Sequence, residues 1–255
     1  MKAYLWKNRK QEIVSVLILL ILWEIASIKM NNDIYLPRIE EVFKSMITII
    51  RGKNFQWNFL SSVYRTLISF FAAYILAVIL GVLSLMYPIF KNFFRPINAI
   101  FKTIPTMVLV VLALVWFDKD KAPFVVGFAI VFPILYEGVM SAINNVDKKI
   151  LEMCKIYNVS KKEKIKKIYL PAIKFYTTGI FVSTFSLAFK VVVAGEVHGQ
   201  PKYGIGAAIQ QEKMNFNITG IFAWIVIIAI MSVILEMSNK FIVIKTNRWK
   251  HESRN

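Results

Sequence analysis

The sequence contains six long apolar runs, and they limit the fold more than any other feature. The runs cover residues 13–28, 66–87, 97–117, 124–143, 173–194 and 218–237. A helix needs about 20 mainly apolar residues to cross a bilayer, and hydrophobic residues make up 57% of this chain. Because backbone polar groups find no water in hydrocarbon, such runs must form helices. The sequence therefore predicts an all-α integral membrane protein with six transmembrane helices, as one domain over residues 1–255 with its core at 60–240.

The first run is the shortest of the six and carries Glu24. Its basic start resembles a signal peptide, but no small-residue cleavage site follows it, so we interpret it as a spanning helix. After it, the segment that follows Pro37 has the spacing of an amphipathic surface helix. Residues 197–217 contain several glycines and Pro201, which favour a turn or a re-entrant piece over a regular helix. Gly81, within the second run, is expected to permit close helix packing.

The positive charge of the chain is distributed unevenly along these runs. The formal net charge is +17, and a cytoplasmic N-terminus would place 20 Lys and Arg residues inside and 10 outside. Cytoplasmic loops of membrane proteins carry such an excess, so the pattern predicts that both termini are cytoplasmic. The basicity then reflects topology and attraction to anionic membrane lipid, and we expect no nucleic-acid partner.

A basic island at residues 147–168 separates the fourth and fifth apolar runs. Its apolar residues have helical spacing in both halves. Asn158, between the halves, tolerates the left-handed conformation that ends a helix, and Ser160 is suited to cap the next one. The sequence predicts a helix, a sharp turn and a second helix, which together present a surface to a soluble partner.

Sequence patterns of enzymes are missing. There is no phosphate-binding GxxxxGK pattern followed by Ser or Thr, and the two histidines, His198 and His251, have no metal-ligand spacing. We therefore predict no catalytic residue, no metal site and no cofactor. A membrane-integral enzyme acting on lipid head groups is the alternative from another class, and it would require acidic or His residues clustered at one membrane face.

The island also carries a specific resemblance. Membrane subunits of ATP-binding-cassette (ABC) importers have a loop with Glu-Ala-Ala, three residues, Gly, nine residues and Ile-x-Leu-Pro. The same spacing is occupied here by Glu152, Met153, Cys154, Asn158, Ile168, Leu170 and Pro171. Segments such as LPRIEEVF at 36–43, FFRPINAIFKTIPTMVLVVLALVWF at 93–117 and VVVAGEV at 191–197 resemble one subfamily, the permeases for nitrate, sulfonates, taurine and thiamine-pyrimidine precursors.

This resemblance implies a type I importer permease fold, with a cytoplasmic coupling helix between helices 4 and 5. It also implies two ATP-binding subunits, a second permease subunit that is identical, an extracytoplasmic solute-binding protein and a place in the bacterial cytoplasmic membrane. The seven residues of the loop signature would contact the ATPase, which alone would hydrolyse ATP. Met153 and Cys154 are larger than the alanines of the signature, so they would alter this fit.

The translocation path and the substrate are less constrained. Pro105 breaks the third run, so Thr103, Pro105 and Thr106 are candidates to line the path, with an ordinary proline kink as the alternative. Lys190, near the outer end of the fifth run, would attract an anion, unless it reaches the interface or pairs with Glu24 or Glu196. Glu196 is itself a path candidate. The subfamily favours a sulfonate, taurine or nitrate-type anion, and a thiamine-pyrimidine precursor or similar heterocycle is the alternative.

Overall fold

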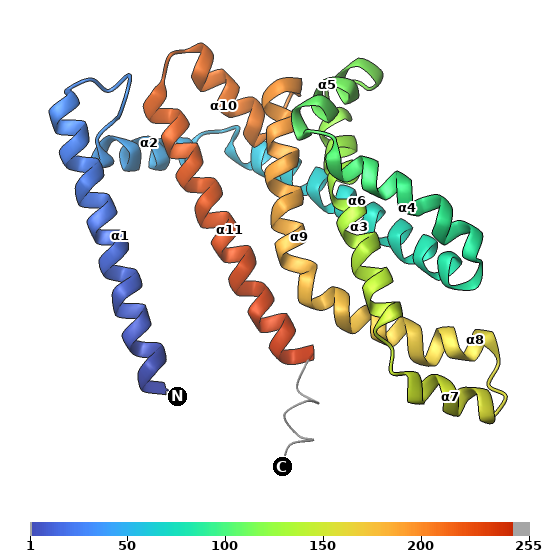
Figure 1. Cartoon of the computed structure of the whole chain (residues 1–255). Helices are drawn as coiled ribbons and strands as arrows, with labels where there is room; N and C mark the ends of the chain where they lie inside the picture. Colours follow the sequence, from blue (N-terminus) through green and yellow to red (C-terminus); the bar gives the residue numbers. More distant parts are fainter. Residues whose placement is uncertain (1, 247–255) are drawn as a thin grey trace. The chain divides into compact units, whose positions relative to one another are not determined.

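The computed structural model describes the backbone of residues 2–246 and the side chains of residues 11 and 14–234. Over this part the chain is helical, and no strand occurs (Figure 1). The helices are α1 (Lys2–Met30), α2 (Ile39–Arg51), α3 (Phe55–Met86), α4 (Pro88–Thr103), α5 (Thr106–Trp116), α6 (Ala122–Asn144), α7 (Lys148–Ile156), α8 (Lys161–Lys164), the π-helix η1 (Ile165–Tyr169), α9 (Leu170–Gly199), α10 (Ile205–Met214) and α11 (Ile218–Thr246). The predicted all-α class is confirmed.

Each of the six apolar runs lies within helix, except where the third is interrupted. Among the described residues, three helical segments are long and apolar enough to cross a membrane: Phe55–Met86, Ala122–Asn144 and Lys161–Gly199. A fourth is gained if α4 and α5 form one broken span. The number of six spans therefore stays a prediction. The C-terminal Arg248, Lys250 and Arg254, which entered the charge comparison, lie outside the described residues.

The chain separates into two compact units, and the first comprises Met1–Gln56 and Ala208–Ile230. In this unit the Glu24 carboxylate accepts a hydrogen bond of 3.2 Å from the backbone N–H of Ile39, the first residue of α2. A negative charge at a helix N-terminus is stabilising because the unpaired N–H groups point toward it. Glu24, an anomaly within an apolar run, thus fixes the start of the amphipathic helix predicted after Pro37.

In the second unit, Trp57–Ala207 and Met231–Asn255, buried residues of α3, α6 and α9 share one hydrophobic cluster. The face that α3 buries is formed by small side chains at helical spacing: Ser62, Thr66, Ser69, Ala73, Ala77, Gly81 and Ser84. Lipid tails are as apolar as side chains, so helices in a membrane associate through close packing, which small residues permit. Gly81 lies against Val139 of α6, and a Cβ at this position would collide with the valine methyl. The packing role expected for Gly81 is confirmed.

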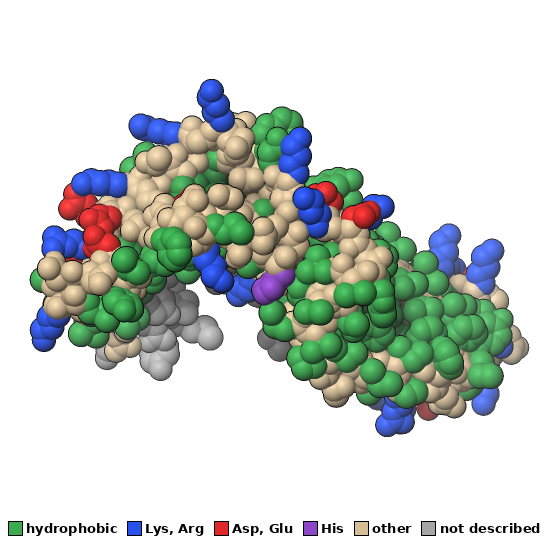
Figure 2. All heavy atoms as spheres, turned by 90° about the horizontal axis from the view of Figure 1, so that it is seen from above, with side chains coloured by type: hydrophobic (Ala, Val, Ile, Leu, Met, Phe, Trp, Pro, Cys, Tyr) green, Lys and Arg blue, Asp and Glu red, His purple; other side chains and the backbone are tan. Residues whose placement is uncertain are grey.

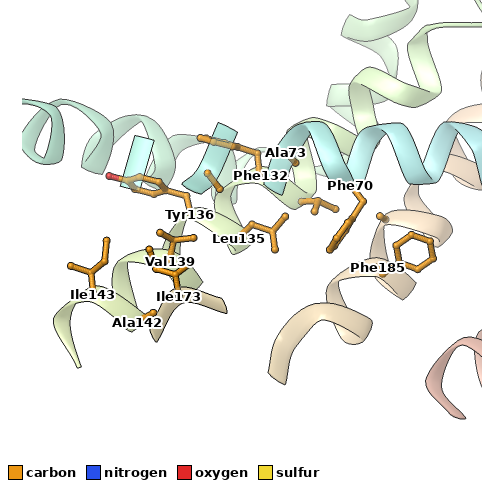
Figure 3. Close-up of a cluster of buried hydrophobic side chains, with 13 residues drawn as sticks. Phe70, Ala73, Phe132, Leu135, Tyr136, Val139, Ala142, Ile143, Ile173 and Phe185 are labelled. Carbon is orange, nitrogen blue, oxygen red and sulfur yellow. The ribbon is translucent and has the colours of Figure 1, made fainter. Parts of the chain in front are cut away.

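Larger side chains fill the space beside this small-residue face (Figure 3). Phe70 of α3 is fully buried and lies edge-on to Phe185 of α9, with ring centroids 5.4 Å apart. Leu135 and Val139 of α6 belong to the same buried cluster. On the outside, Figure 2 shows hydrophobic side chains gathered over a wide part of one face, with Lys and Arg side chains at its margin. Such a surface suits lipid contact.

The break in the third run is sharper than a kink. α4 and α5 meet at Ile104 and Pro105 with a bend of 102°. Ile104 has an extended conformation, which the following proline favours because its ring clashes with a helical neighbour. The predicted break at Pro105 is confirmed, and it divides the run into two separate helices.

The glycine-rich segment after the fifth run is partly different from the prediction. α9 continues to Gly199 and ends at Gln200, whose φ of 46° lies in the left-handed region. A short turn follows, as predicted, but residues from Ile205 to Met214 form the regular helix α10. Gly206 fits within this helix because the backbone of α9 passes next to it, where a Cβ would collide with the Val193 carbonyl.

Replacing Gly81 by Ala should destabilise the protein. The stiff Val139 side chain cannot move aside easily, and overpacking costs about 1–3 kcal/mol. Gly179→Ala in α9 is the matched control, because its added Cβ meets nothing within 4 Å, and it should be neutral or stabilising by up to about 1 kcal/mol. Unfolding in detergent measures both variants, and equal stabilities would contradict the packing argument.

Candidate functional site

The basic island forms a hairpin of α7, a turn, α8 and η1, and its first helix has a capping group at each end. The Asp147 carboxylate accepts a hydrogen bond of 2.9 Å from the Lys149 N–H. At the other end Asn158 has a φ of 52°, the Val159 N–H reaches the Cys154 carbonyl at 2.9 Å, and the Asn158 N–H reaches the Lys155 carbonyl at 3.2 Å. This pair of bonds is the Schellman motif, which requires a left-handed residue at the position of Asn158.

The second half of the hairpin leads back to the long helix α9. The Ser160 hydroxyl caps α8 by accepting a hydrogen bond of 3.3 Å from the Glu163 N–H. The turn before Leu170 is a π-helix, in which the Leu170 N–H bonds to the Ile165 carbonyl. Pro171 follows at once and has no N–H to continue the ordinary pattern. The predicted helix, turn and helix are confirmed, whereas the π-turn was not predicted.

The hairpin exposes apolar side chains that nothing in its own unit covers. Ile150, Met153, Ile156 and Tyr157 form a docking stripe along α7, and the last two are 77% and 76% exposed. Glu152 is exposed beside this stripe, while Cys154 is buried. Met153 and Cys154, the two departures from the alanine signature, therefore differ in environment: Met153 enlarges the surface and Cys154 packs inside the hairpin. Further along, Ile168 is half-buried and Leu170 and Pro171 are exposed.

The candidates for the translocation path lie in two places. Thr103 and Thr106 flank the break between α4 and α5, where Thr103 and Pro105 are exposed. The Thr103 hydroxyl donates a hydrogen bond of 2.9 Å to the Ile100 carbonyl and so satisfies one of the last carbonyls of α4. Lys190 is exposed on α9. Glu196, six residues further on, is fully buried, so its environment is unlike that of the other candidates.

Glu196 belongs to an ionic cluster with Ser62, Arg65 and Asp120. Arg65 Nη1 lies 2.8 Å from Glu196 Oε1 and donates to the Tyr203 carbonyl at 2.7 Å. The remaining guanidinium nitrogens donate to Asp120, Nε to its carbonyl at 3.1 Å and Nη2 to its carboxylate at 3.2 Å. Ser62 Oγ donates to Glu196 Oε2 at 2.6 Å. The cluster connects α3, the α5–α6 loop, α9 and the turn before α10.

Two glycines complete the enclosure of the Glu196 carboxylate. The Gly206 N–H donates to Glu196 Oε2 at 3.1 Å, and a Cβ on Gly204 would lie 2.7 Å from the carboxylate carbon. A buried charge is tolerated only when it is paired and hydrogen-bonded. The sequence offered Glu196 only as one of two alternative partners of Lys190, whereas its ion pair forms with Arg65, 131 positions away. The periodicity of a sequence does not indicate which residues pair at such a large sequence separation.

These features define a helical membrane protein with a capped helical hairpin that exposes an apolar surface. Residues 73–247 match the family described as "Binding-protein-dependent transport system inner membrane component". The chain therefore belongs to this family. It is the permease of an ABC importer, a transport subunit and not an enzyme, and its ATPase is a separate chain. Membership also implies an ATP-binding subunit and a solute-binding protein as partners.

Individual relatives agree with this assignment. The "Taurine transport system permease protein TauC" of Escherichia coli is 19% identical over 97% of this chain and 93% of that protein. An ABC transporter permease protein of Methanocaldococcus jannaschii is 24% identical over 90% of this chain and 88% of that protein. An aliphatic sulfonates transport permease protein, SsuC of Bacillus subtilis, is 23% identical over 74% of this chain and 69% of that protein.

A solved structure shows the same fold. A chain of the MetNI methionine ABC transporter, in an inward-facing conformation, superposes with a TM-score of 0.62 over 75% of this chain and 97% of that chain. The sequence identity is 16%, so the likeness concerns the fold alone. At that level the predicted importer permease fold is confirmed.

Removing the cation of the ionic cluster should lower the free energy of unfolding. Arg65→Met leaves the Glu196 carboxylate buried without its cation, and such a change typically costs about 3–5 kcal/mol of unfolding free energy. Lys121→Met is the control, because the Lys121–Asp118 pair is exposed and 3.7 Å apart and should contribute less than about 1 kcal/mol. Unfolding in detergent compares the two. If Arg65→Met were as stable as Lys121→Met, the cluster would not stabilise the fold.

Proposed function

We propose that the chain forms the path of an importer for small organic oxyanions of the sulfonate class, as a pair of identical permeases with cytoplasmic termini. The support for the substrate class comes from two relatives, which are named as permeases for taurine and for aliphatic sulfonates. The exposed Lys190 on α9 supplies a cation that suits such a solute. The support for the orientation is the twofold excess of Lys and Arg on the inner side of the predicted spans.

The observation that carries the mechanism is the exposed docking stripe on α7. In this proposal α7 is the coupling helix, and Ile150, Met153, Ile156 and Tyr157 enter a groove of the ATPase while Glu152 meets a basic group there. The helix α7 has only nine residues, so it can transmit force only if its ends are fixed. The Asp147 cap and the Schellman motif at Asn158 fix both ends of α7, and Ile168, Leu170 and Pro171 join the hairpin to α9.

Closure of the ATPases would then move the hairpin as a rigid body. α6 ends at Asn144 just before the hairpin, and α9 begins at Leu170 just after it, so both long helices would follow. Packed interfaces move between discrete arrangements rather than deforming continuously. The break between α4 and α5, with Thr103, Pro105 and Thr106, is the segment that we propose to line the path. Glu196, in the ionic cluster, would position α9 and would not touch the solute.

Glu152→Arg tests the coupling role. The variant should fold, because Glu152 is exposed, but it should lose co-purification with the ATPase subunit and the stimulated ATP hydrolysis. Glu40→Arg on α2 is the matched control, because it reverses another exposed carboxylate on the predicted outer side, and it should keep both properties. Normal assembly and turnover with Arg at position 152 would remove Glu152 from the docking surface.

Uptake into proteoliposomes tests the substrate class. With the complete importer and its solute-binding protein, taurine and ethanesulfonate should be taken up, and a neutral hydroxymethylpyrimidine should not compete. Lys190→Met should lower the rate of sulfonate uptake about 10-fold if the cation contributes about 1.4 kcal/mol to binding in the path. Transport of the pyrimidine alone would overturn the proposed substrate, and an unchanged sulfonate rate in Lys190→Met would remove Lys190 from the path.

A further inference from the structure

A pocket between α4 and α6 carries charges that the coupling mechanism does not use. Its volume is about 480 Å³, and its lining includes Lys91, Arg95, Asn98, Lys102, Thr103 and Glu137. The Lys102 ammonium lies 2.8 Å from both carboxylate oxygens of Glu137. Lys91 and Arg95 are exposed, and no ion pair to a described residue is found for either. Three cations therefore face one carboxylate, and the pocket has an excess of positive charge.

The helix α4 has a basic side and an apolar side, and its basic side lines the pocket. Lys91, Arg95, Asn98 and Lys102 recur at steps of four, three and four positions, which places them on one side of a helix. Apolar Ile89, Phe93 and Ile100, at steps of four and seven positions, lie on the other side of the helix and are 74%, 62% and 58% exposed. A helix of this kind lies in a membrane interface with its apolar face toward the acyl chains.

Asn98 has a buried side-chain oxygen to which no described residue donates a hydrogen bond. It is 6% exposed, and its Nδ2 lies 3.4 Å from Glu137 Oε1. Its Oδ1 is buried and has no hydrogen-bond partner among the described residues. A buried acceptor without a donor is costly, so a ligand that brings a hydrogen-bond donor to this wall gains more than a plain anion does.

We propose that the α4–α6 pocket is a binding site for a tetrahedral oxyanion joined to a hydrogen-bond donor. The oxyanion would bind Lys91 and Arg95, because the Arg95 guanidinium matches its geometry, and the donor would reach Asn98 Oδ1. Two molecules supply this chemistry: an aminosulfonate such as taurine, and the phosphodiester of phosphatidylglycerol with its glycerol hydroxyls. Only the first source rests on the proposed function. Phosphatidylcholine has no such donor and carries no net charge.

Two binding measurements on the permease, purified together with its ATPase subunit, distinguish the sources. Calorimetric titration with taurine measures the free solute, and native mass spectrometry after exchange into mixed phosphatidylglycerol and phosphatidylcholine measures retained lipid. Lys91→Gln/Arg95→Gln should weaken binding of the true ligand about 10- to 30-fold, since each cation near a membrane surface contributes about fivefold. Glu137→Gln should strengthen it, because it removes the carboxylate that neutralises Lys102.

Lys162→Gln/Lys166→Gln is the matched control. Both lysines are exposed on the hairpin, so the pair removes the same charge without touching the pocket and should change either affinity less than twofold. The proposal is overturned if the pocket variant binds both probes as the wild type does, or if Glu137→Gln weakens binding. Its failure is distinguishable from that of the importer assignment, because ATPase co-purification and sulfonate uptake are measured separately.

Discussion

Close approach of α3, α6 and α9 through small side chains is the interaction on which the rest of the second unit depends. In lipid no hydrophobic force draws apolar helices together, so the attraction must come from packing and from a few polar contacts. The Gly81–Val139 contact is possible only without a Cβ at residue 81. The same principle holds for Gly127, where an added Cβ would lie 2.7 Å from the Val192 methyl of α9. The hairpin and the ionic cluster lie at the ends of these packed helices, and the break separates α4 from α5 in the chain between α3 and α6.

The two ends of this packed group are stabilised in different ways. At one end, Arg65 and Glu196 connect α3 with α9 by charged hydrogen bonds that are shielded from solvent. At the other end, α6 and α9 are joined through a hairpin whose shape comes from local backbone bonds and caps, with an apolar surface left uncovered. This difference agrees with the function proposed above, in which the hairpin binds the ATPase and the opposite end keeps the helices in register.

The sequence predicted the features that depend on neighbours in the chain. Apolar runs located the long helices, Pro105 located the break, and Asn158 with Ser160 located the turn of the hairpin, because each is a local property of backbone or spacing. Features that depend on residues far apart were missed. The partner of Glu196 is Arg65 in α3. The helix α10 forms where the glycines suggested irregular chain, and Gly206 is needed there because the backbone of α9 leaves no room for a larger residue. The sequence also did not predict the bend of 102° between α4 and α5, since a proline indicates a break but not its angle.

Charged side chains occur in both the ionic cluster, where Glu196 is buried, and the α4–α6 pocket, where they are exposed, and their chemistry differs. Arg65 donates four of its five N–H groups to protein acceptors, and Glu196 accepts from three groups, so little of their hydrogen-bonding capacity is left for a ligand. In the pocket, by contrast, the Asn98 acceptor is unused and the cations outnumber the carboxylate. Charge within a membrane protein therefore does not by itself indicate a binding site. Nearly saturated hydrogen bonding indicates a structural connection, whereas the Asn98 acceptor, which no described residue satisfies, lies beside a cavity and is the reason why we propose a ligand there.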